Sequence, residues 1–136
     1  MQPNEISVSA LAYLGDSVLE LLVRETLVER GISASGELNR EALGYVRASA
    51  QSAAVERLLP LLSEEEAAWY RRGRNNGHLR FPKNTSAAEY RRATGMEVLF
   101  GYLHVTNQET RARELFAAAY PPEVAGKTQK EEETKS

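Results

Sequence analysis

The sequence contains no cysteine. This absence excludes disulfide bonds, zinc sites with thiolate ligands, iron–sulfur clusters and thiol nucleophiles, and it suits a reducing compartment. There are only two histidines, so a bound metal ion would have to be held mainly by oxygen ligands. No apolar run approaches the roughly 20 residues that a membrane-spanning helix needs, and the N-terminus lacks the pattern of a secretory signal. We therefore expect a cytoplasmic protein with no membrane partner.

The composition of the 136-residue chain is that of one globular domain, with 42% hydrophobic and 26% charged residues. A chain of this length has room for one hydrophobic core and too little for a catalytic domain plus an ordinary recognition module. Residues 126–136 contain no apolar side chain. We expect a single domain over residues 1–125 and a disordered tail over residues 126–136.

Apolar residues recur at three- and four-residue steps along most of the chain, which is the period of helices with one buried face. No useful length of strand-like alternation is present, so the sequence predicts an all-α fold. Leu21, Val28, Leu43 and Val46 belong to the apolar faces that we expect to be buried. Capping boxes are expected at Ser63 and Ser86, each followed by a glutamate three residues later. The expected helices cover residues 6–30, 37–62, 63–72, 86–105 and 107–120.

The distribution of charge is uneven, although the formal net charge is only −2. Residues 71–92 contain seven basic side chains and one acid, which leaves the rest of the chain strongly acidic. Part of this window, residues 73–85, is rich in glycine and asparagine and contains a proline, which predicts a loop. A basic loop on an acidic protein is typical of a surface that binds phosphates, although a charge run alone is more often a solvated surface.

Two carboxylates lie where acids are unexpected. Asp16 is in the middle of a predicted helix beside Gly15, and Glu97 is embedded in the apolar stretch MEVLFGYL. A buried carboxylate costs several kcal/mol unless an arginine, hydrogen-bond donors or a metal ion compensates it. For one isolated acid, a position on the solvent edge of a helix or in an arginine salt bridge is the favoured interpretation, and Asp16 lies well off the apolar stripe of its helix. Glu97 is the stronger candidate because apolar residues surround it in the sequence.

Three stretches resemble the ribonuclease III family: LAYLGDSVLEL at residues 11–21, VRASAQ at 46–51 and MEVLFGYL at 96–103. The first is similar to the family's signature helix and the third to its second acidic segment. The resemblance covers roughly residues 7–120. The basic segment RRGRNNGHLRFPKNT resembles the mini-ribonuclease III branch, which has the catalytic domain but lacks the double-stranded-RNA-binding domain.

The resemblance implies an all-helical ribonuclease III-type endonuclease domain that acts as a homodimer and uses Mg2+ as its cofactor. Asp16 and Glu97 match the family's metal ligands and are therefore the expected catalytic and metal-binding residues. Two further acids of the signature are replaced by Ala12 and Thr94. The mini branch shares both departures, and Thr94 is a candidate for holding a metal-bound water.

The resemblance further implies Mg2+-dependent hydrolysis of double-stranded RNA, and within the mini branch it implies maturation of the large-subunit (23S) ribosomal RNA precursor. The basic segment would then take the place of a separate RNA-binding module. Its cations suit phosphates, and its small polar side chains suit sugar hydroxyls and groove edges. The expected RNA-binding residues are Arg71, Arg72, Arg74, Asn75, Lys83, Asn84 and Thr85.

Two other classes of function stay open on the sequence alone. Because two acids of the signature are missing, the domain could be a catalytically degenerate module that only binds double-stranded RNA. A helical protein-interaction module with no role in RNA is the third possibility. Mg2+-dependent cleavage of an RNA duplex separates the first reading from the second, and affinity for the duplex at low salt separates both from the third.

Overall fold

The computed structural model of the protein describes residues 1–76 and 86–122. Over these ranges the chain is all-helical and contains no strand, which confirms the predicted fold class. The predicted tail and residues 77–85 of the basic segment lie outside the described residues. Nowhere in the described ranges is a helix long and apolar enough to cross a membrane. The helices are α1 (Val8–Glu29), α2 (Ser35–Val46), α3 (Ala48–Leu58), α4 (Glu64–Arg74), α5 (Ala87–Val105) and α6 (Glu109–Ala119), with 3-10 turns η1 (Pro3–Glu5) and η2 (Leu59–Leu61).

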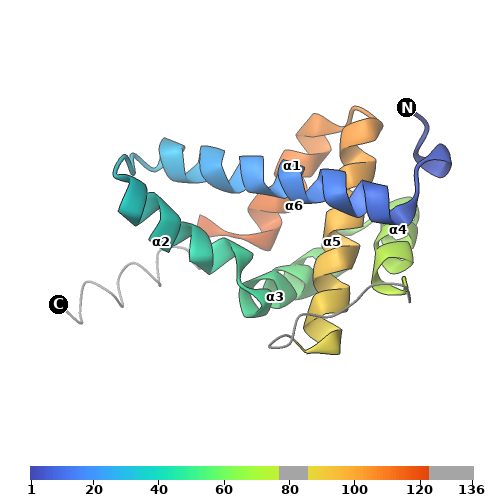
Figure 1. Ribbon diagram of the computed structural model, residues 1–136. Coiled ribbons are helices and arrows are strands. Elements are labelled where there is room, and N and C mark those ends of the chain that lie inside the picture. The colour runs from blue at the N-terminus through green and yellow to red at the C-terminus, as the bar shows by residue number, and fades with distance from the viewer. Residues whose placement is uncertain (77–85, 123–136) are drawn as a thin grey trace.

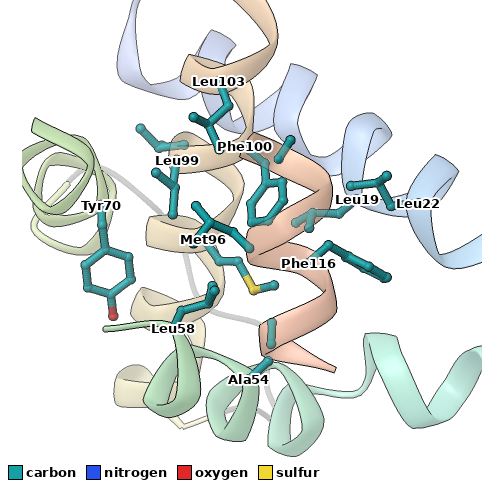
Figure 2. Packing of buried hydrophobic residues seen from close by; sticks show 14 of the residues in the cluster. Leu19, Leu22, Ala54, Leu58, Tyr70, Met96, Leu99, Phe100, Leu103 and Phe116 are labelled. Atoms are coloured by element: carbon teal, nitrogen blue, oxygen red, sulfur yellow. The ribbon is translucent and has the colours of Figure 1, made fainter. Parts of the chain in front are cut away.

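Helix α5 is the centre of the fold (Figure 1) and packs against α1, α3, α4 and α6. Met96, Leu99, Phe100 and Leu103 of α5 are almost completely buried. Figure 2 shows these side chains along α5, where Leu58 of α3, Tyr70 of α4 and Phe116 of α6 join the cluster. Each fully buried side chain of this size contributes about 1.5–3 kcal/mol to stability. A helix that is apolar on nearly every side needs such cover, as its sequence predicted.

The prediction of a single helix over residues 37–62 is wrong, because the chain turns sharply at Arg47. Arg47 has an extended backbone (φ −60°, ψ 145°) and separates α2 from α3. The turn lets Tyr45 of α2 and Val55 of α3 both face the core. Leu43 and Val46, expected in the core, are 41% and 45% exposed. The apolar period continues across the turn, so the sequence pattern does not reveal it.

The start of α4 is fixed by the predicted capping box. Ser63 accepts a hydrogen bond from the backbone N–H of Glu66, whose carboxylate accepts one from the backbone N–H of Ser63. The same carboxylate accepts two further hydrogen bonds, each 2.9 Å long, from Arg111 of α6. The Arg111 hydrogen bond is the main reason that the pKa of Glu66 lies below its usual value. This ion pair ties α4 to α6.

Candidate active site

Helices α1 and α5 touch backbone to backbone, and glycines make this possible. A Cβ atom added to Gly15 would lie 1.6 Å from the carbonyl oxygen of Glu97, and one added to Gly101 would lie 2.2 Å from the carbonyl oxygen of Leu11. No side chain fits at either position. The contact places Asp16, the residue after Gly15, beside Glu97.

Glu97 is a mostly buried carboxyl group that faces another acid. Burial, and to a smaller extent the negative charge of Asp16, raises the pKa of Glu97 to about 7. Asp16 itself is exposed. Within the described part of the chain, neither carboxylate has an ion-pair partner. The structure therefore brings together the two acids that the sequence singled out, and it leaves their charge uncompensated.

This arrangement fits a divalent cation. Two carboxylates offer hard oxygen ligands of the kind that Mg2+ prefers, and a cation between them would offset both their repulsion and the burial of Glu97. Among residues 1–76 and 86–122, no group of three or more histidine, aspartate or glutamate side chains is placed to hold a metal ion. Asp16 and Glu97 would supply two oxygen ligands, and water or substrate can fill other positions.

The two positions where the signature's acids are replaced are both buried. Ala12 is 8% exposed and Thr94 is 4% exposed. The Thr94 hydroxyl donates a hydrogen bond to the carbonyl oxygen of Tyr90 at 3.0 Å. Its proton is therefore used within α5, and only its oxygen lone pairs are left to accept a hydrogen bond from a water molecule.

A cavity of about 300 Å³ opens beside Asp16. Glu20, one turn further along α1, and Gln51 of α3 also line it, and Tyr45, Phe116 and Tyr120 form part of its wall. Sequence reasoning did not select Glu20 or Gln51. Both lie inside stretches that carry the family resemblance, but a single acid or amide on a helix gives no pattern of its own.

The predicted RNA-binding residues are only partly described. Lys83, Asn84 and Thr85 lie outside the described residues, whereas the three arginines lie on the last turns of α4, which extends to Arg74, two residues beyond the predicted end. The guanidinium of Arg72 lies 4.2 Å from the Trp69 ring centre and donates a hydrogen bond to Asn4. Arg74 contacts the Tyr70 ring and the side chain of Asn75. Arg71 is exposed.

A larger groove of about 490 Å³ lies between α1 and the region where α5 is followed by α6. Leu14, Val18 and Leu21 of α1 line it together with His104 and residues of α6. Leu21, predicted to be buried, is 56% exposed, and Tyr13 nearby on α1 is 83% exposed. Val28 is likewise exposed and not buried as expected. The apolar stripe of α1 is thus only partly buried by the core of one chain, and the rest of it is exposed.

Comparison with known proteins identifies the family of the chain. Residues 9–108 match the family model described as Ribonuclease III domain. A curated Mini-ribonuclease 3 of Symbiobacterium thermophilum is 47% identical over 109 residues, which cover 80% of this chain and 84% of that protein. One of Enterococcus faecalis is 44% identical over 78% of this chain and 82% of its own length. A crystal structure of a Fusobacterium nucleatum protein superposes with a TM-score of 0.76 at 26% identity, covering 86% of this chain and 93% of that one.

Proposed function

Because the chain belongs to the ribonuclease III family, and is therefore an endoribonuclease, we propose that it hydrolyses double-stranded RNA with Mg2+ as its cofactor. The observation that carries this proposal is the uncompensated pair of Asp16 and Glu97. A pair of acids held together against their own repulsion is what a divalent-cation site requires. A cytoplasmic location agrees with the cysteine-free sequence.

Asp16 and Glu97 would hold the metal directly. When bound, Mg2+ would supply charge neutralisation at the phosphate and a water of lowered pKa. The role of the two carboxylates is to ionise, to accept the cation and to orient it on rigid helices. Gly15 contributes by bringing the two helices into contact, so that both carboxylates reach the same place.

RNA would dock on the end of α4 and the segment that follows it. The arginines of α4 lie at the C-terminal end of that helix, where cations are favoured and where they could pair with phosphates. Two of them rest on aromatic rings, which holds their guanidinium planes in place. Since Lys83, Asn84 and Thr85 follow in the same segment, we propose that they extend this surface.

We further propose that the enzyme is a homodimer and that its substrate is the large-subunit ribosomal RNA precursor. The apolar groove on α1, with exposed Tyr13 and Leu21 beside it, is the surface that supports dimerisation. Two copies would bring two metal sites to one duplex. The identity of the RNA rests on the resemblance of the basic segment to the mini branch.

Asp16→Asn tests the catalytic proposal. The amide is nearly isosteric but a poor Mg2+ ligand, so cleavage of an RNA duplex should fall by several orders of magnitude while the fold and duplex binding are kept. Glu29→Gln, which neutralises an exposed acid at the end of the same helix, is the matched control and should cleave normally. Normal cleavage by Asp16→Asn would remove Asp16 from the site.

A wild-type protein that binds the duplex but never cuts it would favour the degenerate RNA-binding module instead. The replacements at Ala12 and Thr94 are the specific observation behind that alternative. Mapping cleavage on precursor RNA from cells with and without the protein then tests the substrate.

A further inference from the structure

We propose that Gln51 recognises the 2′-hydroxyl of the ribose next to the cleaved bond, and so makes the site selective for RNA over DNA. This inference rests on the proposed function, because it takes the Asp16 and Glu97 pair as the place where the phosphodiester is cut. Gln51 is a positioning and specificity residue in this proposal and takes no part in bond cleavage.

The placement of Gln51 is the first observation. Its side chain lines the cavity beside Asp16, although it comes from α3 and Asp16 from α1. Its backbone N–H donates a 2.9 Å hydrogen bond to the carbonyl oxygen of Arg47, which sets it in the first turns of α3. Helix α3 in turn packs against α5 and α6. Gln51 is therefore held on a packed helix, in the cavity that Asp16 also lines.

The amide of Gln51 is available to a ligand. The side chain is half-buried, and within the described residues it makes no hydrogen bond to another group. Two other residues that line the cavity, Tyr120 and Glu20, already have hydrogen-bond partners. The Tyr120 hydroxyl donates to the carbonyl oxygen of Tyr45 at 2.8 Å, and Glu20 accepts a hydrogen bond from Arg24.

The chemistry of the cavity selects the ligand group. A carboxylate such as Asp16 or Glu20 only accepts hydrogen bonds and would need a cation to approach a phosphate, whereas an amide donates and accepts at once, as a hydroxyl does. The 2′-hydroxyl lies on C2′, which is bonded to the carbon that carries the leaving 3′ oxygen, so a ribose whose phosphate reaches Asp16 brings its 2′-hydroxyl close by. That hydroxyl is the group by which proteins distinguish RNA from DNA. The cavity of about 300 Å³ falls in the size range of small-molecule sites and can receive one sugar.

The test scans an RNA duplex with single 2′-deoxy substitutions at each ribose around the cut. Binding is measured with Ca2+ in place of Mg2+ so that the duplex stays intact. Wild type should bind about three- to tenfold more weakly when the ribose at the cut loses its hydroxyl, as expected for one neutral hydrogen bond. Gln51→Met should bind the all-RNA duplex more weakly by a similar factor and show no further loss at that ribose.

The matched control is Gln2→Met, the same substitution at an exposed residue near the N-terminus, which should keep the wild-type pattern. Gln51→Asn, which keeps the amide but shortens the side chain, should retain a reduced penalty and serves if the methionine variant folds poorly. A penalty that persists in Gln51→Met, an equal loss on all duplexes, or no sensitive ribose in wild type would each overturn the proposal. Cleavage of the all-RNA duplex by wild type is scored separately, because its failure would refute the proposed function and not only the role of Gln51.

Discussion

Glu97 is a carboxyl group that this protein stabilises in its neutral form. Its raised pKa means that its favourable contribution to folding is fully present below its usual value of 4.5 and is lost as the pH rises through about 7. At pH 8 without metal, the ionised group costs about 3 kcal/mol relative to an exposed glutamate. Metal binding would recover part of this cost.

Glu97→Gln should therefore stabilise the metal-free protein at pH 8 and change its stability little at pH 4.5, because only the charged form is penalised. The free energy of unfolding by urea, measured in EDTA at both pH values, checks this expectation. A gain of the same size at both pH values would show that the effect comes from packing and not from charge. Glu109→Gln, an exposed acid, should give no comparable pH-dependent gain.

At the scale of residues, the sequence selected Asp16 and Glu97 as candidate metal ligands because both fall in helical stretches with a specific motif. The structure places the two acids beside each other, and their role as ligands stays a prediction. It did not identify Gln51, since a lone amide on a helix has no periodic or compositional pattern. It also could not show that Arg72 rests on Trp69, because that contact depends on the positions of both side chains on α4.

Among the elements, the contact between α1 and α5 has no room for a side chain at Gly15. Gly15→Ala should separate the two helices or unfold the protein, and in a protein that still folds it should weaken Mg2+ binding. Gly44→Ala is the control within α2, where an added Cβ meets nothing within 4 Å. The control should be stabilised by about 0.5–1 kcal/mol, because alanine favours a helix over glycine. Thermal unfolding of both variants and Mg2+ titration calorimetry test this pair, and a Gly15→Ala protein with wild-type behaviour would contradict the close contact.

Substitutions of the arginines at the end of α4 should differ in their effects on duplex binding and on the melting temperature. Arg71→Gln should reduce the salt dependence of duplex binding by about one unit in slope and leave the melting temperature unchanged, because Arg71 is exposed. Arg72→Gln should also lower the melting temperature, because it removes the contact with Trp69 and the hydrogen bond to Asn4. Arg57→Gln on α3, which donates a hydrogen bond to the carbonyl oxygen of Ala119, should leave the slope unchanged.

Binding isotherms over a range of salt concentrations, with Ca2+ present, give these slopes. Identical slopes for wild type and Arg71→Gln would mean that RNA docks elsewhere.

The helical elements themselves could largely be predicted from apolar periodicity and capping residues. The break at Arg47 could not, because an extended backbone at one residue leaves the apolar pattern on both sides intact.

At the scale of the whole molecule, the apolar groove on α1 predicts association of two chains. Sedimentation at micromolar concentration should give about twice the 15.1 kDa chain mass. Leu21→Lys, which places a charge in the groove, should shift the protein toward the monomer. Leu61→Lys changes a leucine of similar exposure on η2 and should leave the dimer intact. A wild-type monomer that still cuts both strands would refute the two-site arrangement.

The overall arrangement of the helices around α5 follows from the later part of α5, residues 96–105, which is apolar on nearly every side and requires cover there. The exposed stripe of α1 was predicted to be buried because a periodic pattern shows that a face is apolar but not which molecule covers it. Leu21 is the clearest case, being apolar, in phase with the helix and yet 56% exposed.

The ion pair between Glu66 and Arg111 and the carboxyl group of Glu97 are protonated at different pH values when the protein is acidified. Arg111 keeps the pKa of Glu66 below 4.5, so the stability that this pair contributes is present above that pH and is lost only as the pH falls through the lowered pKa. Without a metal ion Glu97 takes up its proton near pH 7, so below that pH a cation must compete with the proton for this carboxylate. Mild acid should thus reduce the activity of the enzyme while the contact between α4 and α6 is still intact. Returning the sample to neutral pH should restore the activity without any refolding.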